Sequence, residues 1–228
     1  MLFSITVVIL FLLQGVDMKQ PSVYTRENII DATVDLIREQ GWHQVTTRKI
    51  AKQMGASTMP IYSHLKSLDD LEQDLRVKVR SMLKEFQLHS YTDQPLLNLA
   101  FGYVVFARDE KQLFRFLYLD RPELIERGNL SGMKDSFFEQ FGEDSPVGAA
   151  LSAMEEEGQE AMIQNTWIFT HGLAMLVNSG SLGSCPDKTI LNYLQGAGEA
   201  FYLWGARKTS SHAPHTKPGN SGKTEQSE

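Results

Sequence analysis

The chain has 228 residues, of which 42% are hydrophobic and 22% are charged, and its formal net charge is −6 at pH 7. This length and composition indicate a globular protein of one or two domains and exclude wholesale disorder. The single cysteine, Cys185, excludes a disulfide framework and any metal site built from several cysteines. It is typical of a reducing, cytoplasmic compartment. The acidic balance argues against a protein that coats nucleic acid indiscriminately.

The charge is unevenly distributed along the chain. Residues 18–88 carry 11 basic and 9 acidic side chains, whereas residues 89–228 carry 11 basic and 18 acidic ones. Residues 40–68 contain four Lys or Arg and no Asp or Glu. A basic face on an otherwise acidic protein favours site-specific DNA binding, because attraction to phosphates is then confined to one surface.

The first 13 residues are almost entirely apolar. This run is too short to span a bilayer, and it lacks the basic start of a signal peptide. We predict that translation starts at Met18 and that residues 1–17 are an upstream extension outside the fold. A membrane-tethered regulator, with residues 1–13 as its anchor, is the minority alternative.

From Thr25 onward the apolar residues recur with a helical period, which predicts an all-α fold. We expect Thr25 to cap a helix that Gly41 ends, and Ser57 to cap a very short helix. The predicted helices cover about 25–40, 46–54, 57–65, 68–89, 95–108, 109–119, 121–128, 131–141, 146–179 with a break, and 187–207. Residues 208–228 are expected to be a disordered tail.

Residues 46–65 have the spacing of a helix–turn–helix. Ala51 is small where two helices would cross, Gly55 stands where the turn needs a positive φ, and Ile61 can pin the next helix onto the first two. A helical hairpin that merely packs is the alternative. The absence of acidic residues from this stretch favours DNA, with the second helix in the major groove.

The stretch VTTRKIAKQMGASTMPIYSHLKSLDDL resembles the DNA-binding domain of the TetR family of transcriptional regulators. The resemblance covers residues 25–72. It implies a DNA-binding domain over residues 18–67 and an antiparallel helical domain for effector binding and dimerisation over residues 68–207. It further implies a cytoplasmic homodimer, most often a repressor, that binds a palindromic operator and releases it when a small-molecule effector binds.

The resemblance also assigns roles to individual residues. Thr47 is similar to a phosphate-contacting threonine of the family and Arg48 to a base-reading arginine. The expected DNA contacts are Thr47, Arg48, Ser57, Thr58, Met59, Pro60, Tyr62, His64 and Lys66. Several have structural alternatives: Tyr62, Met59 and Pro60 as packing residues, and His64 as a solvated helix end. The family often has a lysine where this chain has Leu68, which puts one phosphate contact in doubt.

In the acidic half, Trp167, His171 and Met175 recur every four residues and share one helix face. The Trp-x-x-x-His-Gly pattern resembles one branch of TetR-type C-terminal domains. The expected effector-binding residues are Phe106, Trp167, His171 and Met175. A core tryptophan and an internally hydrogen-bonded histidine are an equally good interpretation.

The last predicted helix has apolar residues at a 4-3-4-3 spacing, which is typical of a helix–helix seam. Together with the preceding helix it predicts a dimer interface of Leu173, Val177, Ile190, Leu194, Ala197, Phe201 and Trp204. The same residues could instead form the core of one subunit.

The sequence contains no catalytic motif, so we expect no enzyme activity, cofactor or metal site. The alternative to a regulator is a helical ligand-binding or scaffold protein whose DNA binding is lost or weakened, which the departure at Leu68 would support.

Overall fold

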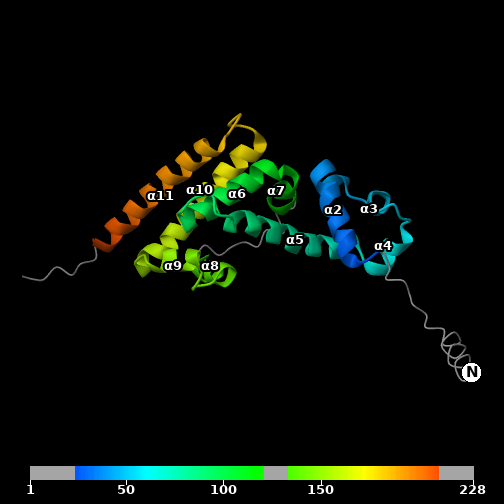
Figure 1. The fold of residues 1–228 in the computed structure, drawn as a ribbon, viewed down its shortest axis with the longest axis horizontal. Coiled ribbons are helices and arrows are strands. Elements are labelled where there is room, and N and C mark those ends of the chain that lie inside the picture. Colours follow the sequence, from blue (N-terminus) through cyan, green and yellow to red (C-terminus); the bar gives the residue numbers. More distant parts are fainter. Residues whose placement is uncertain (1–23, 121–132, 211–228) are drawn as a thin grey trace, which may run out of the picture.

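The computed structural model describes residues 24–120 and 133–210, except the side chains of residues 157 and 204–210. All regular secondary structure in these two ranges is helical, as expected (Figure 1). The expected extension over residues 1–17 and the helix expected over 121–128 lie outside the described residues. The helix expected to end at 207 continues to Ser210, and the rest of the expected tail lies outside them as well.

The helix bounds agree closely with the periodicity of the sequence. The elements are α2 (Arg26–Gln40), η1 (Trp42–Gln44), α3 (Thr47–Gln53), α4 (Met59–His64), α5 (Leu68–Leu88), α6 (Pro95–Asp109), α7 (Lys111–Tyr118), α8 (Met133–Phe141), α9 (Pro146–Ser152), α10 (Glu156–Ser179) and α11 (Asp187–Ser210).

Side-chain caps fix where most of the N-terminal helices begin. The Thr25 side chain accepts a hydrogen bond from the Asn28 N–H, and Thr46 and Ser67 do the same at the starts of α3 and α5. The cap expected from Ser57 is wrong. Helix α4 begins later, at Met59 after Thr58, and no side chain bonds to its first turn.

Helix α2 packs against α5 and against α3, and α3 and α4 lie with it at one end of the molecule (Figure 1). Their shared core includes Ile29, Ile37, Ile50, Ile61 and Leu71, each at most 2% exposed. The burial of these five side chains from four helices fixes the relative orientation of α2, α3 and α4.

The rest of the chain packs around α6, which lies between α5 and α10 in Figure 1. Eleven consecutive residues of α6, from Leu97 to Ala107, are buried. Gly102 allows α5 and α6 to approach closely, since a Cβ at this position would overlap the carbonyl of Phe86. Helices α10 and α11 lie side by side over the far face of α6.

Helix α7 joins the two ends of the molecule. Arg76 of α5 forms a buried ion pair with Glu72 (3.0 Å) and donates to the carbonyl of Leu117 in α7 (3.1 Å). The ring of Phe116 packs on the Arg76 guanidinium from one side and contacts Trp42 of η1 at 5.1 Å between centroids. Helices α2, α5 and α7 therefore form one packed unit.

The residues expected at a dimer interface occupy a different place. Leu173, Val177, Ile190 and Leu194 are each at most 6% exposed and belong to the core of the single chain. A side chain already enclosed by its own chain offers little surface to a partner, which favours the alternative that these four residues form the core of one subunit. Ala197 and Phe201 are half-buried, and the side chain of Trp204 lies outside the described part of the chain.

Candidate nucleic-acid interface and internal cavity

Helix α4 presents large side chains to solvent. Met59 is 76% exposed and Tyr62 is 66% exposed, while Ile61 between them is buried against α2 and α3. Neither Met59 nor Tyr62 is therefore a packing residue within this chain. Exposed apolar and aromatic side chains on a short helix are typical of a surface that meets a partner.

Helix α3 contributes the basic side chains next to α4. Arg48 and Lys52 are exposed, and no ion pair to either is found among the described residues. The side chain of Lys49 is hydrogen bonded within the chain, because its Nζ donates to Gln40 Oε1 (2.8 Å) and to Gln44 Oε1 (3.1 Å). Thr47, at the first position of α3, is half-buried.

The turn between α3 and α4 has the geometry that the sequence predicts. Gly55 has φ +62°, a conformation that only glycine adopts without strain. The N–H of Ala56 donates to the carbonyl of Ala51 (2.9 Å), and Ala51 itself is 3% exposed. This turn sets the angle at which α4 leaves α3.

The remaining expected contacts lie within α4 or directly beside its two ends. Ser57 and Lys66 are exposed, whereas Thr58, Pro60 and His64 are half-exposed. Leu68 is half-buried and packs against the core at the first position of α5. The structure thus brings the expected DNA contacts together around α3 and α4.

Arg26 holds the end of α4 and was not singled out from the sequence. Its guanidinium donates to the carbonyl of His64 (2.8 Å) and pairs with Asp70 (3.1 Å) and Asp74 of α5. These contacts raise the pKa of Arg26 and lower that of Asp70, chiefly through the hydrogen bond they share. No local sequence signal reveals this clamp, because Arg26 lies 44 and 48 residues from its two aspartates.

A cavity of about 950 Å³ lies in the C-terminal half of the molecule. Side chains of α5, α6, α8, α10 and α11 line it, among them Trp167 and His171. The other two expected effector residues do not line it. Phe106 is fully buried against Phe86, and Met175 packs against the core one turn beyond the cavity.

His171 sits among aromatic rings at the inner wall of this cavity. Its Nδ1 lies 2.9 Å from the hydroxyl of Tyr103, and its ring stacks on Trp167 at 5.3 Å and 5°. The ring of Tyr118 meets its edge at 5.4 Å. Burial lowers the pKa of His171 and raises the pKa of Tyr103, so both groups are uncharged near neutral pH.

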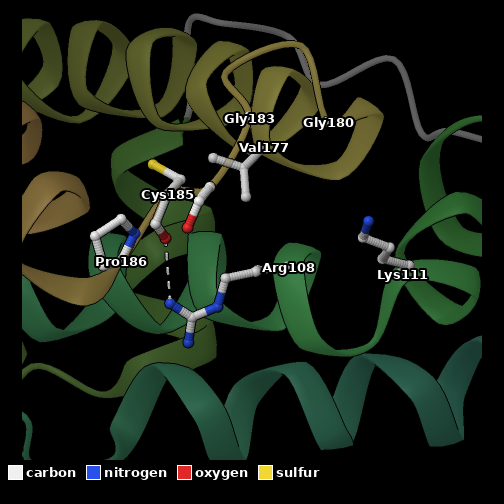
Figure 2. A pocket seen from close by; sticks show the side chains of 8 residues that line it. Arg108, Lys111, Val177, Gly180, Gly183, Cys185 and Pro186 are labelled. Carbon is white, nitrogen blue, oxygen red and sulfur yellow. Dashed lines mark hydrogen bonds between the residues drawn. The ribbon is translucent and has the colours of Figure 1, made fainter.

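A second, smaller cavity of about 320 Å³ lies beside the loop between α10 and α11 (Figure 2). Arg108 lines it and donates to the carbonyl of Cys185. The guanidinium also bonds to Asp109 and Asp187, which raise its pKa. Because its charge is compensated in this way, Arg108 fastens the loop to α6 and does not form an anion site.

Helices α10 and α11 also expose an apolar face. On α11 the exposed residues Tyr193, Gly196, Ala200 and Leu203 follow a 3-4-3 spacing. On α10 Ile168 and Leu176 are about half exposed, with the exposed Gly172 between them. We call this set of residues the α10–α11 face.

The described residues contain no cluster of histidine, cysteine and acidic side chains that could hold a metal ion. None of their helices is both long and apolar enough to cross a membrane.

Comparison with known proteins identifies the N-terminal unit. Residues 29–73 match the family described as bacterial regulatory proteins, tetR family. An uncharacterized HTH-type transcriptional regulator of Mycobacterium tuberculosis is 25% identical over 168 residues, which cover 71% of this chain and 73% of the relative. Tetracycline repressor protein class D of Escherichia coli is 33% identical over 63 residues, 28% of this chain and 29% of that protein.

The fatty acid metabolism regulator protein of Bacillus subtilis is 46% identical over 43 residues, 19% of this chain and 22% of that protein. The crystal structure of a TetR-like transcriptional regulator from Rhodococcus sp. RHA1 aligns with a TM-score of 0.49 and 15% identity, over 81% of this chain and 96% of that one. The sequence matches, together with the geometry of α3 and α4, confirm the family that the motif predicts. Residues 29–73 therefore form a helix–turn–helix DNA-binding domain of the tetR family of bacterial regulatory proteins.

Proposed function

We propose that this protein is a ligand-responsive repressor that binds a palindromic DNA operator as a homodimer in the cytoplasm. The observation that carries the proposal is the surface of α3 and α4, where Arg48, Met59 and Tyr62 are exposed in a stretch without acidic residues. In this view residues 18–67 bind DNA and residues 68–207 bind the effector and the second subunit, with α5 shared between the two.

The proposed roles on DNA follow the exposure of each side chain. Arg48 reads a base edge in the major groove, where a bidentate contact to guanine is the commonest specific one. Met59 and Pro60 meet base edges or a thymine methyl, with Ser57 and Thr58 beside them. Thr47, Tyr62, His64 and Lys66 bind phosphates and fix the register.

The proposed dimer uses the α10–α11 face in place of the seam expected from the sequence. Tyr193, Ala200 and Leu203 are exposed on α11, and the small Gly196 lets a second helix approach closely. Nothing lies within 4 Å of a Cβ built at Gly196 or at Gly172, so both positions are open. A two-fold arrangement would set two α4 helices about 34–36 Å apart, one turn of DNA.

The cavity beside His171 is the proposed effector site. Helix α5 lines this cavity through Leu83 and Lys84, and near its other end Asp70 holds Arg26 and thereby the end of α4. Tyr118 of α7 also lines the cavity, one residue after the carbonyl that Arg76 binds. A ligand that displaces α5 or α7 would therefore alter the support of α4.

The proposal is tested by selecting sheared genomic DNA with the purified protein at near-physiological salt and sequencing what is retained. We expect enrichment of a short palindrome, and an affinity for it that falls steeply with salt as phosphate contacts release counterions. Arg48→Ala serves as the control. The protein is unfolded and refolded during purification to remove any bound ligand. If it then enriches no sequence above the level of Arg48→Ala, the alternative of a helical ligand-binding protein without DNA function is favoured.

A further inference from the structure

The chemistry of the cavity wall changes from its rim to its interior. Among the described residues that line it, only Arg80, Lys84 and Glu199 carry a charge. Arg80 and Glu199 are exposed at the rim. Lys84 donates through Nζ to the carbonyl of Gln140 (2.6 Å) and lies over the ring of Phe141.

The interior wall is apolar apart from a few uncharged polar groups. Leu97, Ala100, Leu151 and Leu194 line it and are each at most 9% exposed. A charged group placed against this wall would lose its hydration and find no opposite charge, which disfavours its binding. The interior therefore selects against ions.

His171 lines the interior and has a ring nitrogen left over for a ligand. Its Nδ1 is engaged by the Tyr103 hydroxyl, and no hydrogen bond to Nε2 is found among the described residues. A tyrosine hydroxyl both donates and accepts. If Tyr103 donates to Nδ1, Nε2 carries the proton and donates to a ligand; if Nδ1–H donates to Tyr103, Nε2 accepts.

We propose that the cavity binds an uncharged, largely apolar molecule whose single buried polar group, a hydroxyl or a carbonyl, hydrogen bonds to Nε2 of His171. Trp167 stacks on one face of the imidazole and Tyr118 meets its edge, so the ring is held in one orientation toward that group. The regulatory meaning of this binding rests on the proposed function, but the binding itself does not.

The test uses three probes that share one alkyl chain and differ in the head group: decanol, decanoate and decylammonium. Each is titrated into the full-length protein at neutral pH by calorimetry. We expect decanol to bind about 10-fold or more tightly than either ion, which corresponds to about 1.4 kcal/mol. Tighter binding of decanoate, or binding of none of the three, would overturn the proposal.

Two tyrosine variants separate the buried hydrogen bond from general contact with the cavity. Tyr103→Phe removes the hydroxyl that orients His171, whereas Tyr202→Phe removes an exposed hydroxyl from the rim of the same cavity. We expect decanol affinity to fall several-fold in Tyr103→Phe and to stay unchanged in Tyr202→Phe. Equal affinities in both variants would place the decanol hydroxyl elsewhere, and circular dichroism checks that Tyr103→Phe is folded.

DNA binding is measured separately in the same samples. If decanol binds as expected but leaves DNA affinity unchanged, the effector role fails and the cavity chemistry stands. If decanoate binds more tightly than decanol, the proposed ligand chemistry of the cavity fails, whatever the change in DNA affinity.

Discussion

At the scale of single residues, Arg48 is the side chain on which sequence-specific recognition is expected to depend. It is exposed on α3, and none of the described acidic side chains forms an ion pair with it. We expect Arg48→Ala to weaken binding to the selected operator by about 1–3 kcal/mol and to change binding to random DNA much less. Titration of both DNAs by fluorescence anisotropy measures this. An equal loss of affinity for the operator and for random DNA would identify Arg48 as a phosphate contact.

Lys52 provides the matched control, since it is an exposed basic residue on the same helix without an assigned base contact. Lys52→Ala should reduce operator and random DNA binding alike, with a shallower dependence on salt.

His171 gives a second prediction at this scale, concerning pH and stability. Burial lowers its pKa in the folded protein below about 6.5, the value expected when unfolded. The unfolded chain therefore binds this proton more readily, and acidification favours unfolding. We expect the free energy of unfolding to fall less between about pH 7.5 and pH 5.5 in His171→Phe than in the parent protein. Urea unfolding of both proteins at the two pH values measures the change in the free energy of unfolding. An identical change in the two proteins would contradict the prediction.

At the scale of elements, the contact between α5 and α6 depends on Gly102. A methyl group there would overlap backbone atoms of Phe86 and Gln87, which no side-chain rotation can relieve. We expect Gly102→Ala to lower the free energy of unfolding by about 1–3 kcal/mol, the usual cost of forcing extra volume into a packed core. Gly158→Ala in α10 is the control, because a Cβ there meets nothing within 4 Å. Its stability should be unchanged or slightly higher, since alanine favours helix.

The elements also show which features the sequence could predict. Thr25, Gly41 and Gly55 act through their own backbone, so the ends of α2 and the turn before α4 were predictable from local chemistry. The cap predicted at Ser57 was wrong, because α4 begins at Met59 and no side chain bonds to its first turn. Arg26 and its partners in α5 are more than 40 residues apart in sequence, a distance at which helical periodicity carries no information.

The interior of the C-terminal half was harder to predict for a related reason. A helix packed on two sides has more than one apolar stripe, and spacing alone does not tell which stripe faces its own chain. In α11 the stripe through Ile190 and Leu194 is core, and the one through Tyr193 and Leu203 is exposed. Trp167 and His171 line the cavity, whereas Met175, which the spacing puts on the same helix face, does not.

At the scale of the whole molecule, the α10–α11 face is expected to join two copies of the chain. We expect Ala200→Glu to shift the mass in solution from dimer to monomer at micromolar concentration, because a buried carboxylate without a partner is costly. Ala149→Glu, at an exposed alanine of α9, is the control and should remain dimeric. Light scattering after size-exclusion chromatography measures both. A dimer in Ala200→Glu would place the interface elsewhere.

Helix α5 serves both ends of the molecule at once, since Asp70 near its start supports α4 and Lys84 lines the cavity. Any coupling that α5 carries between the two binding sites is reciprocal, because both affinities belong to one thermodynamic cycle. The factor by which an occupied cavity weakens DNA binding is then also the factor by which bound DNA weakens occupancy of the cavity. On this scheme, protein bound at an operator has a lower affinity for the ligand than protein free in solution, so the number of operators in a cell influences how much ligand is needed to release them.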